Sequence, residues 1–233
     1  MIASATTTRT TASGWREAVT AWSVGCLVLG VGGFVVCGRW LRASPDRFWA
    51  GVYWQLAFAA GLAITQTYIV WRLKQRGESL RHIGWRAPTS RKAIAAGVLL
   101  GVWYSSGVIA GILHDDLMAG INPFAFHWVR LALIPVGIAM AIGEESLMRG
   151  FIMRELSVAR VLTWLSGACS AVYHAIHNWS WLGFLPSFVL FTLHAGLFVA
   201  ARRSLTPTSI AHSLDHDLNA PYLLMYALQQ VPA

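Results

Sequence analysis

Long apolar stretches alternate with short polar segments along most of the chain. Several of the stretches approach the roughly 20 residues that a helix needs to cross a bilayer core. The pattern therefore predicts an all-α fold, a polytopic transmembrane helical bundle of about seven spans, with eight as the alternative count. The expected spans are residues 18–38, 49–71, 93–113, 127–153, 161–180, 182–201 and 206–228.

The composition agrees with a membrane protein. Of the 233 residues, 56% are hydrophobic and only 12% are charged, whereas roughly a quarter of the residues of a soluble domain are charged. Many of the 12 Trp residues fall at the ends of apolar runs, where interfacial aromatic side chains are typical. We find no internal repeat and no soluble domain, so residues 1–233 are expected to form a single integral membrane domain.

A net charge of +8 could indicate a protein that binds nucleic acid. The distribution of the basic residues along the chain indicates a membrane topology instead. If the N-terminus is cytoplasmic, fourteen of the 18 Lys and Arg residues fall on the cytoplasmic side of the expected spans. The positive-inside rule then predicts a multi-pass protein of the cell (inner) membrane with a cytoplasmic N-terminus and an external C-terminus. The lipid bilayer is the expected partner of this charge, and no nucleic acid is expected.

Two adjacent carboxylates, Glu144 and Glu145, stand at the end of the apolar run from Leu131 to Ile142. Ionisable groups inside membrane segments cost several kcal/mol, so such a pair is a candidate functional site. Arg149 follows four residues after Glu145, and later apolar segments carry more titratable side chains. These are His174, His177, His212 and His216.

Simple geometry predicts that these groups meet. If residues 127–153 and 161–180 form an antiparallel hairpin that turns beside Arg160, Glu144 and His177 are equidistant from the turn. Spacings of four residues also place Glu145 with Arg149, and His212 with His216, on single helix faces. We expect one polar cavity, because inward-facing polar groups are the least costly arrangement in lipid.

This set of side chains has the chemistry for peptide hydrolysis. The reaction needs an activated water, a base that takes its proton, and donors directed at the developing oxyanion. Imidazole and carboxylate groups are also normal ligands of a catalytic zinc ion, which keeps one position open for water. A divalent metal, with zinc as the first candidate, and a metal-free glutamate–histidine pair both remain open.

Three spaced motifs now stand in order: Glu144-Glu145-x-x-x-Arg149, Tyr173-x-x-x-His177 and His212-x-x-x-His216. They resemble the EExxxR, FxxxH and HxxxN or HxxxD motifs of the CAAX-type intramembrane endopeptidases, the CPBP family of CAAX proteases and bacteriocin-processing enzymes. The resemblance covers roughly residues 126–218. The segment from Leu80 to Arg86 also looks like the short surface stretch that often precedes this core.

The resemblance implies a role for each matching residue. Glu144 is the expected general base, and His177 is expected to hold the attacking water, directly or through a metal. His212 contributes to the same centre or stabilises the oxyanion, and Glu145 and Arg149 form a supporting ion pair. If a metal is used, the implied ligands are Glu144, His177 and His212.

His216 departs from the family pattern, because the family usually has Asn or Asp at this position. A histidine can donate to an oxyanion or ligate a metal, so His216 is kept as the fourth catalytic candidate. Two histidines lie outside the motifs: His174 is expected to be structural or to support the site, and His194 is expected to be structural. Asp215 and Asp217 are open as ligands or orienting groups.

The sequence thus predicts an intramembrane endopeptidase that hydrolyses a peptide bond in a membrane-associated protein or peptide, with its active site toward the cytoplasm. Two alternatives remain open. A catalytically inactive relative could act as an immunity or binding protein, an alternative that the histidine at position 216 keeps open. A small proton or metal-ion transporter could use the same polar groups, although the chain shows no two matching halves.

Overall fold

The computed structural model describes residues 11–30, 47–87, 90–118, 129–158, 164–178 and 184–229, and these form helices joined by short turns, with no strand among them. The all-α prediction is therefore confirmed for this part of the chain. In order, the elements are α1 (Thr11–Gly25), the π-helix η1 (Cys26–Gly30), α3 (Arg47–Gln75), the 3-10 helix η3 (Leu80–Ile83), α4 (Arg91–Met118), α5 (Val129–Glu145), the π-helix η4 (Ser146–Ile152), α6 (Met153–Val158), α7 (Trp164–Asn178), α8 (Phe184–Ala200) and α9 (Thr206–Gln229).

Each expected span has a helical counterpart, since α1 runs on into η1, and α5, η4 and α6 follow one another without a break. Among the described residues, one helical stretch, Gln55–Gln75, meets the length and hydropathy of a membrane span. The apolar helix Phe184–Ala200 is shorter.

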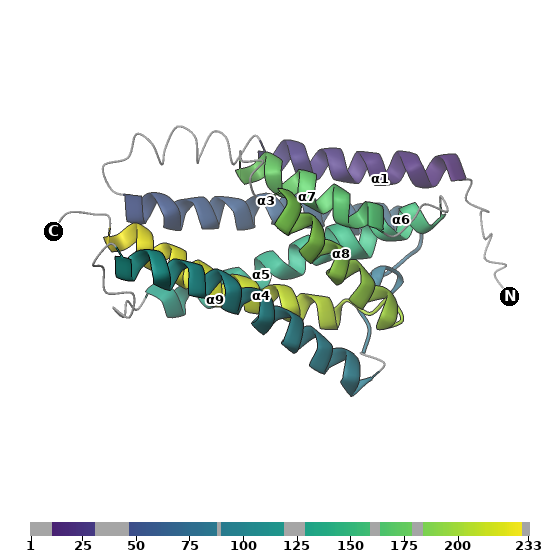
Figure 1. Cartoon of the computed structure of the whole chain (residues 1–233). Coiled ribbons are helices and arrows are strands. Elements are labelled where there is room, and N and C mark those ends of the chain that lie inside the picture. The colour runs from purple at the N-terminus through teal and green to yellow at the C-terminus, as the bar shows by residue number, and fades with distance from the viewer. Residues whose placement is uncertain are drawn as a thin grey trace, which may run out of the picture.

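The π-helix η4 lies in the middle of the hydrophobic core. All seven of its residues are buried, and Leu147 and Phe151 are fully inaccessible among side chains from α1, α3 and α7. In Figure 1, α1 runs along one side of the molecule, while α4 and α9 lie together on the opposite side. The core therefore holds the segment that follows Glu145 in a fixed position.

Close packing of α4 against α9 depends on two glycines one turn apart. A Cβ atom at Gly97 would lie 2.3 Å from the carbonyl oxygen of Pro207, and one at Gly101 would lie 2.7 Å from that of Ala211. Small residues at this spacing let two helix backbones approach closely. Because His212 follows Ala211 directly, this contact helps to fix its place on α9.

Charged side chains form a balanced network beside the core. Glu17 pairs with Arg72 and, at 2.8 Å, with Arg76, which also contacts the buried Glu155 at 2.9 Å. Burial alone would raise the pKa of Glu17, but hydrogen bonds and charge from Arg72 and Arg76 lower it below its usual value. The carboxylate therefore contributes stability near neutral pH that is lost as the pH falls through its lowered pKa.

Candidate active site

Both carboxylates of the EExxxR motif are buried at the junction between α5 and η4. Glu144 is 1% exposed, and Glu145 and Arg149 are 0% exposed. The π-helix η4 begins directly after Glu145 and contains Arg149. Such a distortion is frequent at functional sites. Burial of three ionisable side chains is costly unless each finds a partner, so their partners show how the site is built.

Glu144 faces histidines from two other helices. Its Oε2 atom lies 3.1 Å from Nε2 of His174 on α7 and 3.6 Å from Nε2 of His212 on α9. Nδ1 of His174 donates to the carbonyl oxygen of Ser170, 2.7 Å away. Glu144 therefore has an imidazole in contact with its carboxylate, a pairing that suits acid–base chemistry.

Glu145 orients two histidines, His194 and His212. Its Oε1 atom accepts hydrogen bonds from Nδ1 of His212 at 3.0 Å and from Nδ1 of His194 at 3.2 Å. With Nδ1 of His212 engaged in this way, Nε2 is directed at Glu144. A carboxylate that fixes the tautomer and ring orientation of a histidine is a common support for catalytic and metal sites.

Arg149 holds the other side of Glu145. Its Nη1 atom lies 3.5 Å from Oε1 of Glu145 and donates to the hydroxyl of Ser170 at 3.2 Å. Nη2 donates to the carbonyl oxygen of Phe191 at 3.4 Å, and the guanidinium stacks over the Phe191 ring at 4.7 Å from its centroid. Arg149 thus joins η4 to α7 and α8 and balances a buried negative charge.

His216 completes the cluster from the next turn of α9. Its ring stacks on that of His212, with centroids 4.9 Å apart. Its Nε2 atom and both carboxylate oxygens of Glu144 are buried and have no hydrogen-bond partner among the described residues. Ligand atoms of Glu144, His212 and His216 all lie within 4.8 Å of one another. One carboxylate and two imidazoles leave a coordination position for water, so these residues fit a catalytic divalent metal.

A second group with the same spacing consists of Glu145, His194 and His212. Here the carboxylate Oε1 already accepts a hydrogen bond from Nδ1 of each histidine. That bonding engages Oε1 of Glu145 and Nδ1 of both histidines without an ion. In the group containing Glu144, both carboxylate oxygens and Nε2 of His216 are buried without a hydrogen-bond partner among the described residues, so that group is the better metal candidate.

The predicted hairpin and most of the predicted cluster are present. The hydroxyl of Ser166 donates to the carbonyl of Met148, and His174, farther along α7, contacts Glu144, which is earlier in the chain than Met148, as an antiparallel pair of helices requires. The predicted turn at residue 160 and the side chain of His177 lie outside the described part of the chain, although His177 belongs to α7.

Two histidines that contact the glutamates were not identified as their partners from the sequence. His174 and His194 match no motif position, yet they contact Glu144 and Glu145 respectively. The spacing of residues in α7 could have identified His174. Ser170 and His174 are four residues apart and so share a helix face, and Ser170 is also the partner of Arg149.

The fold and the site together define a class: an all-helical protein with a buried carboxylate–histidine centre, a group of residues that could hold a metal ion. Residues 123–215 match the family model described as Type II CAAX prenyl endopeptidase Rce1-like. The match confirms the family resemblance over this segment, and that family is one of proteases. It includes Glu144, His177 and His212 and ends one residue before His216. No curated protein and no solved structure matches the chain.

Proposed function

We propose that this protein is an intramembrane endopeptidase in which Glu144 activates water for attack on a peptide bond. The observation that carries the proposal is the buried Glu144 carboxylate, in contact with His174 at 3.1 Å and His212 at 3.6 Å. The family match to endopeptidases supports the same reaction class. The proposal is tested by asking whether membrane proteins lose a processed end when Glu144 is replaced.

The chemical step assigns a task to each side chain. Glu144 takes a proton from water as the water oxygen bonds to the peptide carbonyl carbon. The carbonyl oxygen becomes an oxyanion, and a histidine N–H from His212 or His216 donates to it. The proton that Glu144 took from water then passes to the departing amine as the C–N bond breaks. Glu145 keeps His212 directed at the reaction, and Arg149 keeps Glu145 ionised in a buried site.

We further propose that a divalent cation, with zinc as the first candidate, belongs to this centre. Glu144, His212 and His216 would hold it, because their ligand atoms lie within 4.8 Å of one another. His177 stays a candidate ligand on the motif resemblance. When bound, such an ion acts as a Lewis acid and lowers the pKa of coordinated water.

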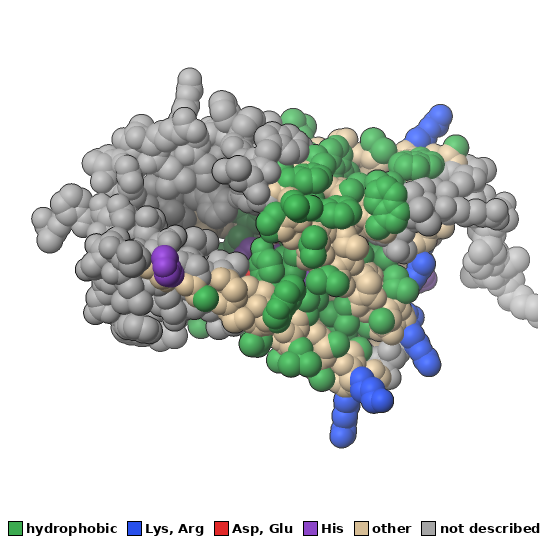
Figure 2. Space-filling view, viewed as in Figure 1, with side chains coloured by type: hydrophobic (Ala, Val, Ile, Leu, Met, Phe, Trp, Pro, Cys, Tyr) green, Lys and Arg blue, Asp and Glu red, His purple; other side chains and the backbone are tan. Residues whose placement is uncertain are grey.

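A membrane location for this chemistry is supported by the surface. Large apolar side chains such as Leu99, Trp103 and Leu185 are at least 60% exposed, and the face in Figure 2 is largely hydrophobic where it is described, with Lys and Arg at one edge. A continuous apolar surface of this kind marks a site of contact with a membrane or with another protein. We propose a multi-pass protein of the inner membrane, with its active site toward the cytoplasm, acting on membrane-associated proteins or peptides.

Both histidines of α7 are expected to matter. Replacing His174 by Ala removes the imidazole that contacts Glu144, and His177→Ala removes the motif histidine. We expect each change to lower the cleavage rate about 100-fold, the usual scale for one acid–base group. His114→Ala, which changes an exposed histidine of α4, should leave the rate unchanged. If either α7 variant cleaves at the wild-type rate, the histidine that it lacks is not part of the active site.

Metal content tests the assignment of His216. If His216 is a ligand, the His216→Asn variant should retain metal about tenfold less tightly than the wild type, since one of three protein ligands becomes a poorer donor. Inductively coupled plasma mass spectrometry after dialysis against a graded chelator series measures the difference. Equal retention in both proteins, with activity kept in the variant, would instead assign His216 to the oxyanion.

A further inference from the structure

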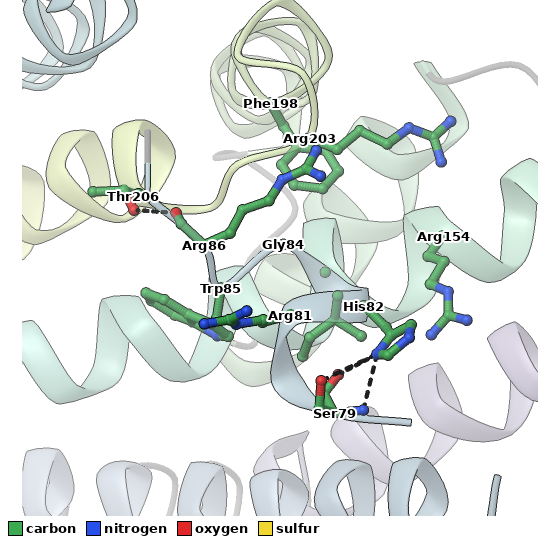
Figure 3. A pocket seen from close by; sticks show the side chains of 13 residues that line it. Ser79, Arg81, His82, Gly84, Trp85, Arg86, Arg154, Phe198, Arg203 and Thr206 are labelled. Atoms are coloured by element: carbon green, nitrogen blue, oxygen red, sulfur yellow. Dashed lines mark hydrogen bonds between the residues drawn. The ribbon is translucent and has the colours of Figure 1, made fainter. Parts of the chain in front are cut away.

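A pocket of about 1110 Å³ lies apart from the carboxylate–histidine centre, where the segment from Ser79 to Ala87 faces the turn between α8 and α9. Figure 3 shows side chains from both segments, together with Arg154, around this space. Neither Glu144 nor any of its histidine partners lines it. The described lining residues include no carboxylate, and the basic ones are Arg81, His82, Arg86, Arg154 and Arg203.

Three of these arginines carry charge that no described carboxylate neutralises. Arg154 is paired with Glu78 through two contacts of 2.6 and 2.8 Å. Arg86, in contrast, donates to the carbonyl oxygen of Arg202, and Arg203 donates to the hydroxyl of Ser157 at 3.1 Å. These acceptors are neutral, and Arg81 is exposed to solvent. The pocket therefore has a positive field suited to an anion.

The two walls of the pocket are fixed to each other by backbone contacts. Leu205 N–H donates to the carbonyl oxygen of Gly84 at 2.9 Å, and the hydroxyl of Ser204 donates to that of Arg86 at 3.2 Å. Gly84 has a φ of +107°, and a Cβ atom there would lie 2.6 Å from the carbonyl oxygen of Arg203. Only glycine satisfies both conditions, so the arrangement of the walls is specific.

The backbone also holds Arg203 at the pocket at some cost. Arg202 and Arg203 have φ values of +53° and +59°, in the left-handed region that is unfavourable for a residue with a side chain. Hydrogen bonds from their N–H groups to the carbonyl oxygens of Val199 and Phe198 compensate for part of this cost. Two consecutive arginines in this conformation are a local strain of the kind found at binding sites.

We propose that this pocket binds a phosphate group. Guanidinium groups recognise phosphate oxygens through paired, charge-assisted hydrogen bonds, and three arginines without a carboxylate partner among the described residues line this pocket. Trp85, Ile83 and Phe198 provide apolar surface in the same lining. The combination suits the headgroup of an anionic phospholipid, whose source is the surrounding membrane, and free phosphate is the other source of the same chemistry. The proposal does not depend on proteolysis.

Binding is tested on the purified full-length protein in a non-ionic detergent. The probes are short-chain phosphatidylglycerol, its phosphatidylcholine counterpart and inorganic phosphate, and native mass spectrometry with a thermal-shift titration measures affinity. We compare the wild type with Arg81→Gln and with Arg81→Gln/Arg203→Asn, in which Asn tolerates the left-handed backbone. Arg91→Gln/Lys92→Gln removes the same charge from an exposed part of α4 and is the matched control.

We expect the wild type and the control to bind phosphatidylglycerol alike. Arg81→Gln should bind it about tenfold more weakly, as loss of one charge-assisted bond predicts, and the double variant more weakly again. Competition by inorganic phosphate would assign the site to the phosphate group itself, whereas no competition would assign it to a lipid headgroup. Equal loss in the pocket variants and the control, or no loss in Arg81→Gln, would overturn the proposal.

Discussion

Replacing Glu144 by Gln should lower the rate of peptide cleavage by about 10³-fold, within the range that a positioned general base contributes. The amide has the shape of the carboxylate but cannot accept the proton of the attacking water. The fold should persist, because a neutral side chain at a site that is 1% exposed removes a buried charge and adds none. Cleavage of a membrane-protein substrate and the melting temperature in detergent measure the two effects separately.

Glu144→Asp is the matched variant for this experiment. It keeps the carboxylate but withdraws it by about one methylene from His174 and His212, so we expect partial activity between that of the wild type and Glu144→Gln. Wild-type cleavage by Glu144→Gln, with an unchanged melting temperature, would show that another group is the base.

Replacing Arg149 by Met should destabilise the protein by about 3–5 kcal/mol, the usual cost of removing one partner of a buried ion pair. Arg149 is fully buried, and its loss leaves Glu145 without its only guanidinium contact among the described residues. It also removes the hydrogen bonds to Ser170 and Phe191. For a chain of this size the melting temperature should fall by roughly 10 °C.

A double-mutant cycle separates the ion pair from the packing of the arginine. Glu145→Gln combined with Arg149→Met removes both charges, and we expect it to recover part of the lost stability relative to Arg149→Met alone. Arg91→Met, at an exposed position of α4, is the control for loss of an arginine. If the double variant is less stable than the wild type by the sum of the two single losses, the two side chains act independently.

The sequence was sufficient for the helical class and for most of the acid–histidine cluster. Apolar stretches of helical length predicted the seven helical segments, and motif spacing brought together Glu144, His212 and His216, whose ligand atoms the structure places within 4.8 Å of one another. A midpoint argument about one hairpin placed α7 opposite Glu144, where the structure has His174 at 3.1 Å.

The remaining features depend on contacts that no local pattern encodes. One turn of α7 separates His174 from His177, and helix rotation and the π-turn of η4 decide which histidine faces an acid. His194 reaches Glu145 only because α8 lies against α7 and α9. The arginine pocket combines two turns more than a hundred residues apart, joined by hydrogen bonds such as that between Leu205 and Gly84. Such pairings follow from tertiary packing and not from periodicity.

The central claim, proteolysis by Glu144, is tested most directly by comparing the ends of membrane proteins in cells that express the wild type or Glu144→Gln. Mass spectrometry of N- and C-terminal peptides should reveal an end that is present only with the wild type, which would also identify the substrate. Identical sets of ends under several growth conditions, with both proteins folded in the membrane, would contradict the claim and favour a protein that uses this cavity only to bind.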